Sequence, residues 1–70
     1  MHLKNLAKIR KEKGLTQEGL ARKADISYHT VLKLESGRIK NPKIETVLKL
    51  AEALGVSVDE LIKKLWRIIF

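Results

Sequence analysis

Apolar residues recur at intervals of three and four along most of the chain, which is the spacing of one face of an α-helix. We therefore predict five helices, over residues 2–13, 16–23, 27–36, 42–54 and 57–65. In the fourth helix, the predicted core stripe is Ile44, Val47, Leu48, Ala51 and Leu54. No segment alternates apolar and polar residues for long enough to predict a strand. The pattern predicts an all-α fold.

Residues that commonly begin or end helices stand at the predicted borders. Glycines 14, 37 and 55 each follow a helical stretch, where a left-handed cap favours glycine. The predicted N-caps are Thr16, Ser27, Asn41 before Pro42, and Ser57, which has Glu60 three residues later as a capping box. The link between the second and third helices is about three residues long, so these helices must cross steeply, as in a helix-turn-helix.

Charge points to a polyanionic partner. The 70 residues suffice for one domain and carry 15 Lys and Arg against 8 Asp and Glu, a net charge of +7. Nucleic acid and an anionic membrane surface both fit this balance. The segment from Gly37 to Lys43 contributes three cations and no acid, beside the third helix. We expect this loop to contact phosphates.

Composition argues against several other classes. The chain has no cysteine, and His2 and His29 have no further ligands nearby, so we expect no disulfide, metal or cofactor. No paired carboxylates or nucleophile–base set indicates an enzyme. No apolar run approaches the roughly 18 residues of a membrane span, and the N-terminus lacks a signal-peptide core. We expect a soluble, cytoplasmic protein.

Several sequence features coincide with one known family. They are Thr16-Gln17, Leu20-Ala21, Ile26-Ser27, Val31, Leu34-Glu35, Gly37, Pro42, and Ala51 with Gly55-Val56-Ser57. With these residues the chain resembles the Cro/repressor type of helix-turn-helix protein, the XRE family, from residue 3 to about residue 62. The resemblance implies a five-helix, lambda-repressor-like domain over residues 1–64. The apolar tail over residues 65–70 is a departure, because the family core does not require it. The resemblance also implies that the third helix enters the major groove of DNA.

The resemblance assigns roles to individual residues. At about 100° per residue, Tyr28, His29, Leu32 and Lys33 share the outward face of the third helix. The family pattern implies base contacts for Tyr28, His29 and Lys33, and we add Leu32 as a contact for a thymine methyl group. A solvated polar face is the alternative. The expected phosphate contacts are Gln17, Ser27, Arg38, Lys40, Asn41 and Lys43. Arg10 and Glu35 match a partly buried ion pair of the family.

One position departs from the family pattern. Gly19 stands where an acidic residue is common, so we expect no capping box in the second helix. Glycine inside a helix also costs about 0.5–1 kcal/mol relative to alanine. Either this helix frays, or Gly19 permits the close approach of another backbone.

The C-terminal end is more apolar than a small monomer easily buries. We predict a homodimer interface formed by Val58, Leu61, Leu65, Trp66, Ile68, Ile69 and Phe70. The alternatives are that the tail folds back over its own domain or, less favoured, that it lies at a membrane surface.

These features predict a sequence-specific double-stranded DNA-binding transcriptional regulator, a repressor that binds a palindromic operator as a homodimer. The alternative is a protein-interaction module or antitoxin, in which the fifth helix and tail bind a toxin or other protein.

Overall fold

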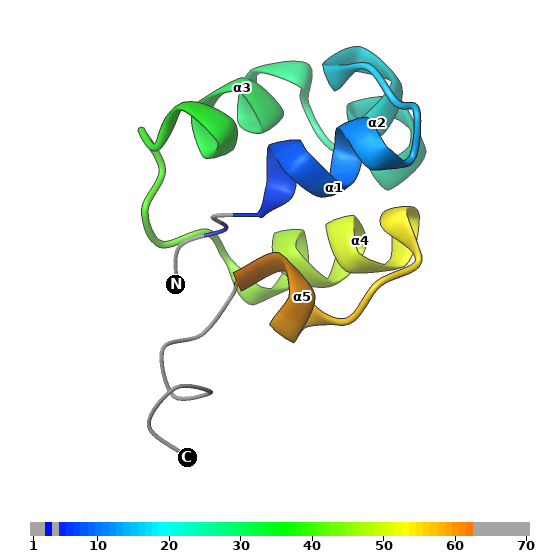
Figure 1. The fold of residues 1–70 in the computed structure, drawn as a ribbon. Helices are drawn as coiled ribbons and strands as arrows, with labels where there is room; N and C mark the ends of the chain where they lie inside the picture. The colour runs from blue at the N-terminus through cyan, green and yellow to red at the C-terminus, as the bar shows by residue number, and fades with distance from the viewer. Residues whose placement is uncertain (1–2, 4, 63–70) are drawn as a thin grey trace.

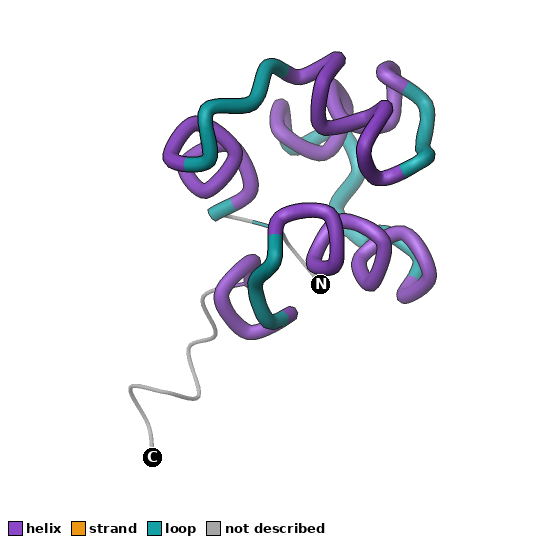
Figure 2. Tube along the Cα trace, turned by 90° about the vertical axis from the view of Figure 1, so that its right-hand side faces the viewer, coloured by secondary structure: helices purple, strands orange, loops and turns teal. Residues whose placement is uncertain are grey.

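The computed structural model describes residue 3 and residues 5–62, which form helices joined by turns (Figure 1). The helices are α1 (Leu6–Glu12), α2 (Gln17–Ala24), α3 (Tyr28–Ser36), α4 (Ile44–Leu54) and α5 (Val58–Ile62). Figure 2 shows no strand in the described part of the chain. The predicted all-α fold of five helices is confirmed. None of the described helices is long and apolar enough to cross a membrane.

The first helix begins later than predicted because Asn5 is used elsewhere. The backbone N–H of Asn5 donates to the carbonyl of Leu61 at 3.1 Å, and its side-chain amide donates to the carbonyl of Glu60 at 2.9 Å. These bonds join the entrance of α1 to α5, and α1 starts only at Leu6. Segments from opposite ends of the sequence therefore lie side by side.

All five helices share one hydrophobic core. Its seven fully enclosed large side chains are Leu6, Leu20, Val31, Leu34, Val47, Leu50 and Leu61. Each such side chain stabilises the fold by about 1.5–3 kcal/mol through the hydrophobic effect. Because even the short α5 contributes Leu61, the described helices form a single packing unit.

In α4, the predicted core stripe is partly wrong. Val47, Ala51 and Leu54 are buried as expected, but Ile44 and Leu48 are 57% and 54% exposed. Leu50 and Ala53 are buried in addition. The helix is therefore rotated relative to the predicted stripe, because α2 packs on the flank that carries Ala53 and leaves the opposite flank open.

Side-chain caps fix the starts of three helices. Thr16 Oγ1 accepts from the N–H of Gly19 at 2.9 Å, and Ser27 Oγ accepts from the N–H of His29 at 3.1 Å. Ser57 and Glu60 bond reciprocally as the predicted capping box. The predicted cap at Asn41 is wrong, because Lys43 is the extended residue before Ile44, and it offers no side-chain acceptor.

The turn between α2 and α3 is closed by a residue in the left-handed region. Asp25 has φ 58° and ψ 48°, a conformation tolerated by aspartate. The next residue, Ile26, donates its N–H to the carbonyl of Ala21 at 2.9 Å and packs against the core. This tight turn sets α3 steeply across α2, as the short link predicts (Figure 1).

Candidate nucleic-acid interface

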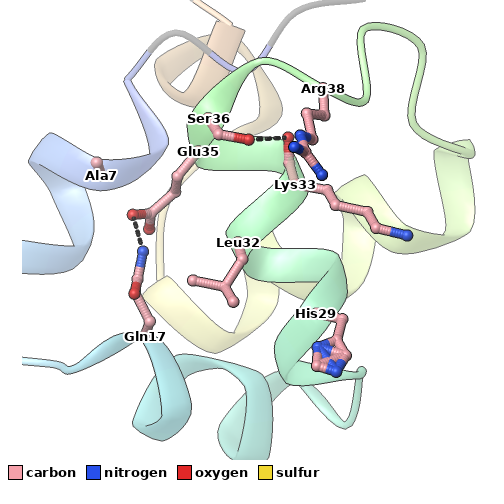
Figure 3. A pocket seen from close by; sticks show the side chains of 8 residues that line it. All are labelled: Ala7, Gln17, His29, Leu32, Lys33, Glu35, Ser36 and Arg38. Carbon is pink, nitrogen blue, oxygen red and sulfur yellow. Dashed lines mark hydrogen bonds between the residues drawn. The ribbon is translucent and has the colours of Figure 1, made fainter.

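The outward face of α3 is polar and cationic. Tyr28, His29 and Lys33 are exposed, whereas Val31 and Leu34 on the opposite face are buried. The rings of Tyr28 and His29 lie 6.1 Å apart and tilted. Figure 3 shows His29 and Lys33 on the same side of the helix, with Arg38 beyond them. These side chains therefore form one row along the outer side of α3.

A groove of about 700 Å³ runs beside this row. Its lining residues come from α1, α2, α3 and the loop after α3: Ala7, Gln17, His29, Leu32, Lys33, Glu35, Ser36 and Arg38. Leu32 is half-buried and points into the space between α3 and the other two helices (Figure 3). Leu32 therefore forms part of the groove floor, with the cationic side chains on one rim.

Arg10 and Glu35 form an ion pair that joins α1 to α3. The guanidinium donates from Nε to Glu35 Oε2 at 2.7 Å and from Nη2 to Oε1 at 3.2 Å. The two side chains are only 10% and 8% exposed, respectively. Arg10 Nη1 also donates to the carbonyl of Leu15 at 2.8 Å, which anchors the turn before α2. The predicted pair is present, and it bonds in two places, as a planar guanidinium and a carboxylate allow.

Gln17 is held by the same carboxylate. Its Nε2 donates to Glu35 Oε1 at 2.9 Å, as Figure 3 shows. A side-chain amide has two N–H donors, so one remains for another acceptor. Gln17 is also the first residue of α2, where backbone N–H groups have no partner within the helix. The side chain and backbone of this residue thus offer donors at the same helix end, which favours an anion.

Ser27 caps α3 and lies next to the exposed row. Its oxygen accepts from the N–H of His29, so the hydroxyl hydrogen is left to donate. A phosphate oxygen only accepts hydrogen bonds, so the remaining donor is of the right kind for a phosphate contact.

The loop between α3 and α4 carries further cations, of which Arg38 lines the groove. Arg38, Lys40 and Lys43 are exposed, as is Asn41. Between the first two, Ile39 packs against the core and donates its N–H to the carbonyl of Lys33 at 3.1 Å. The loop is therefore attached to α3, and its basic side chains extend the positive surface.

Electrostatically, the groove and its rim are positive. The one carboxylate among the lining residues, Glu35, is paired with Arg10. Lys33 and Arg38 add positive charge to the same surface. A polyanion is the ligand that this charge distribution attracts.

The expected dimer residues divide into three groups. Leu61 is 0% exposed in the core, so it has no surface for a second copy unless α5 moves. Val58 is half-buried and packs against the core. Leu65, Trp66, Ile68, Ile69 and Phe70 lie outside the described residues.

Sequence reasoning missed two features of this surface. Ala7 of α1 lines the groove, a position that sequence reasoning does not assign to it. The bond between Gln17 and Glu35 was also not foreseen. The spacing within each helix gives no signal for it, because the partners lie on α2 and α3 and meet only after those helices pack.

Comparisons with known proteins agree with the fold. A helix-turn-helix family model matches residues 6–61. The uncharacterized HTH-type transcriptional regulator y4dJ of Sinorhizobium fredii is 47% identical over 58 residues, which are 83% of this chain and 74% of that protein. DdrOP3, an HTH-type transcriptional regulator of Deinococcus deserti, is 38% identical over 58 residues, or 83% of this chain and 44% of that protein.

Two solved structures resemble the fold closely. A SinR protein/SinI protein complex matches with a TM-score of 0.84 and 31% identity, over 91% of this chain and 62% of that chain. A hypothetical transcription factor, NHTF from Neisseria, matches with a TM-score of 0.80 and 31% identity, over 93% of this chain and 74% of that chain. The chain belongs to the XRE-type helix-turn-helix family of DNA-binding transcriptional regulators.

Proposed function

We propose that this protein is a sequence-specific repressor that binds a palindromic DNA operator as a homodimer. The observation that carries the proposal is the row of Tyr28, His29 and Lys33 on the exposed side of α3, beside donors held at the start of α2. In a two-fold dimer, two copies of α3 would face successive major grooves, about 34–36 Å apart.

Base reading would fall to the exposed row on α3. Lys33 has only donors, and guanine offers two acceptors, O6 and N7, in the major groove. We therefore expect a guanine opposite Lys33 in each half-site. His29 and Tyr28 would contact the neighbouring base pairs. Leu32, which lies in the groove floor and not in the exposed row, would meet a thymine methyl group only if the base edge enters the groove.

Phosphate binding would fix the position of α3 in the groove. We assign it to Gln17 and Ser27 at the helix starts and to the loop residues Arg38, Lys40, Asn41 and Lys43. Such contacts carry no sequence information but set the register of the protein on the duplex. The Gln17 side chain is already oriented by Glu35, so its position is set before DNA binds.

The proposal is tested by the substitution Lys33→Ala. We expect a loss of about 1–3 kcal/mol on the selected operator and a much smaller loss on scrambled DNA, because only the operator supplies the guanine contact. The measurement is a matched pair of titrations at fixed salt, after selection of a binding site from random DNA. Lys23→Ala is the control. This substitution also removes one positive charge, but from an exposed lysine beside α4 that does not line the groove.

Equal losses on both DNAs would show that Lys33 is only a phosphate contact. Failure of the wild-type protein to select any sequence would overturn the proposed function itself.

A second candidate is a module that binds another protein, such as a toxin or an antagonist. The similarity to a structure of SinR in complex with SinI supports it, because that relative is seen with a protein partner. A protein-binding module of this kind predicts only weak, sequence-independent DNA binding, which the titrations with operator and scrambled DNA would reveal.

A further inference from the structure

One face of α4 exposes large apolar side chains without an assigned role. Ile44 and Leu48 are more than half exposed, and they stand four residues apart on the same side of the helix. One exposed apolar side chain is ordinary, but Ile44 and Leu48 are neighbours on the helix surface and form a contiguous apolar patch. In Figure 1, α1 lies between α3 and the pair of α4 and α5, so the patch is on a different element from the row on α3.

Two carboxylates stand beside the two apolar side chains of this patch. Glu45 and Glu52 are exposed and lie within the same arc of α4 as Ile44 and Leu48 at about 100° per residue. Lys49 stands on the edge of this arc, and its Nζ lies 3.7 Å from Glu45 Oε1. We call the four residues Ile44, Glu45, Leu48 and Glu52 the outer face of α4. In a chain with net charge +7, this face combines apolar surface with two carboxylates, of which Glu45 pairs with Lys49.

The segment after α5 has the complementary composition. Residues 63–70 read KKLWRIIF, with three cations, no acid and five large apolar residues. The described chain ends at Ile62 in α5, which packs directly against α4. The apolar side chains of this segment would contact Ile44 and Leu48, and its lysine or arginine side chains would pair with Glu45 and Glu52.

We propose that the outer face of α4 binds residues 63–70 of a second copy of this chain. This inference rests on the homodimer in the proposed function and assigns the surface that the dimer uses. Leu61 lies in the core, so the dimer contact is formed by the outer face of α4 together with the tail rather than by the buried side of α5.

Two arguments favour a dimer in which each tail binds α4 of the other copy: the symmetry of the dimer and the surface area that its interface must bury. In a two-fold dimer each copy presents the same surfaces, so one face and one tail per chain give two identical contacts. A stable interface needs about 1,200–2,000 Å² in total, and one aromatic side chain buries about 150–250 Å². Two tails with Trp66 and Phe70 supply surface on this scale, which Ile44 and Leu48 of one chain alone do not.

The test uses the absence of cysteine from the sequence. Full-length Leu48→Cys and Ile68→Cys variants are mixed in equal amounts at micromolar concentration and oxidised. We expect a covalent heterodimer to form about 100-fold faster than with Lys11→Cys in place of Leu48→Cys, because binding holds the thiols at millimolar effective concentration. Lys11 is exposed on α1 and serves as the matched control.

Two results would overturn this inference. Equal rates for Leu48→Cys and Lys11→Cys would show that the tail does not reach α4 of the other copy. A disulfide within one chain of the double variant Leu48→Cys/Ile68→Cys, without covalent dimer in the mixture, would place the tail on its own α4.

Sedimentation separates these failures from failure of the proposed homodimer. Wild-type protein that sediments as a dimer, together with no cross-link, removes only the α4 contact. A wild-type monomer at high micromolar concentration removes the homodimer as well, while the titrations with Lys33→Ala still report on DNA recognition. In a dimer of the inferred kind, Leu48→Glu weakens association about tenfold, and Lys11→Glu, on α1 and off this face, leaves it unchanged.

Discussion

Glu35 is the residue on which three helices converge. Its carboxylate accepts from Arg10 of α1 and Gln17 of α2 while it stands on α3. A buried ion pair is a modest source of stability compared with apolar packing, but the loss of one partner leaves the other charge uncompensated. Glu35 therefore matters for the fold and, through Gln17, for the proposed phosphate contact.

We expect Glu35→Gln to lower the free energy of unfolding by about 3 kcal/mol, because Arg10 stays enclosed without its counter-charge. The measurement is urea unfolding followed by circular dichroism. Glu45→Gln is the control, since its pair with Lys49 is exposed and such pairs contribute about 0.3–0.5 kcal/mol. Similar losses in the two variants would contradict a special role for the buried pair.

At the residue scale, the sequence supported assignments that follow from local pattern. The exposed row on α3 follows from helical spacing, and the family resemblance supplied the pair of Arg10 and Glu35. The bond from Gln17 to Glu35 and the placement of Ala7 in the groove depend on how helices pack against one another. A pattern within one helix contains no information about such contacts.

At the scale of the elements, Gly19 shows how a cap can survive the loss of an expected partner. Thr16 still accepts from the backbone N–H of Gly19, although no acidic side chain returns the bond. The nearest atoms to a Cβ placed on Gly19 belong to the side chains of Thr16, at 3.1 Å, and Leu15, at 3.8 Å. Within the part of the chain that the structure describes, no backbone of another segment lies within 4 Å of this Cβ, so the alternative of a close backbone approach at Gly19 is wrong.

We expect Gly19→Ala to raise the free energy of unfolding by about 0.5 kcal/mol. Alanine gains about 0.5–1 kcal/mol of helix propensity, and part of this gain is lost when Thr16 Oγ1 shifts by a few tenths of an ångström. Thermal and urea unfolding measure the change. Gly37→Ala is the contrasting variant, because Gly37 has φ 83° and alanine is strained there. Destabilisation by Gly19→Ala would mean that the cap at Thr16 cannot adjust.

The helix borders were predicted where a side chain supplies the cap and missed where the backbone or a tertiary contact decides. Thr16, Ser27 and Ser57 cap α2, α3 and α5 as predicted. The late start of α1 depends on the bond from Asn5 to Leu61, 56 positions further along the chain. The exposed stripe on α4 depends on which flank α2 covers. Spacing in one helix identifies an apolar side but not its tertiary partner.

At the scale of the whole molecule, the positive surface predicts a steep dependence of DNA binding on salt. If each subunit neutralises about three to four phosphates, the slope of log K against log salt is roughly −5 to −7. Lys40→Ala should flatten this slope by roughly two units in a dimer and weaken all sequences about equally. Titrations at several salt concentrations measure both effects.

Lys23→Ala serves again as the control, because Lys23 lies beside α4 and away from the groove. A slope near zero for the wild type would remove the proposed phosphate contacts, and an unchanged slope for Lys40→Ala would remove that one residue from the set.

The attachment of Ile39 has a consequence for the energetics of binding. Its packing against the core and its bond to Lys33 fasten the middle of the loop, so Arg38 and Lys40 emerge from a backbone that moves with α3. The ordering entropy of that backbone is lost when the protein folds and not when it meets DNA. The proposed phosphate contacts and base contacts would therefore be made by one rigid unit, whereas a flexible basic arm loses conformational entropy each time it binds.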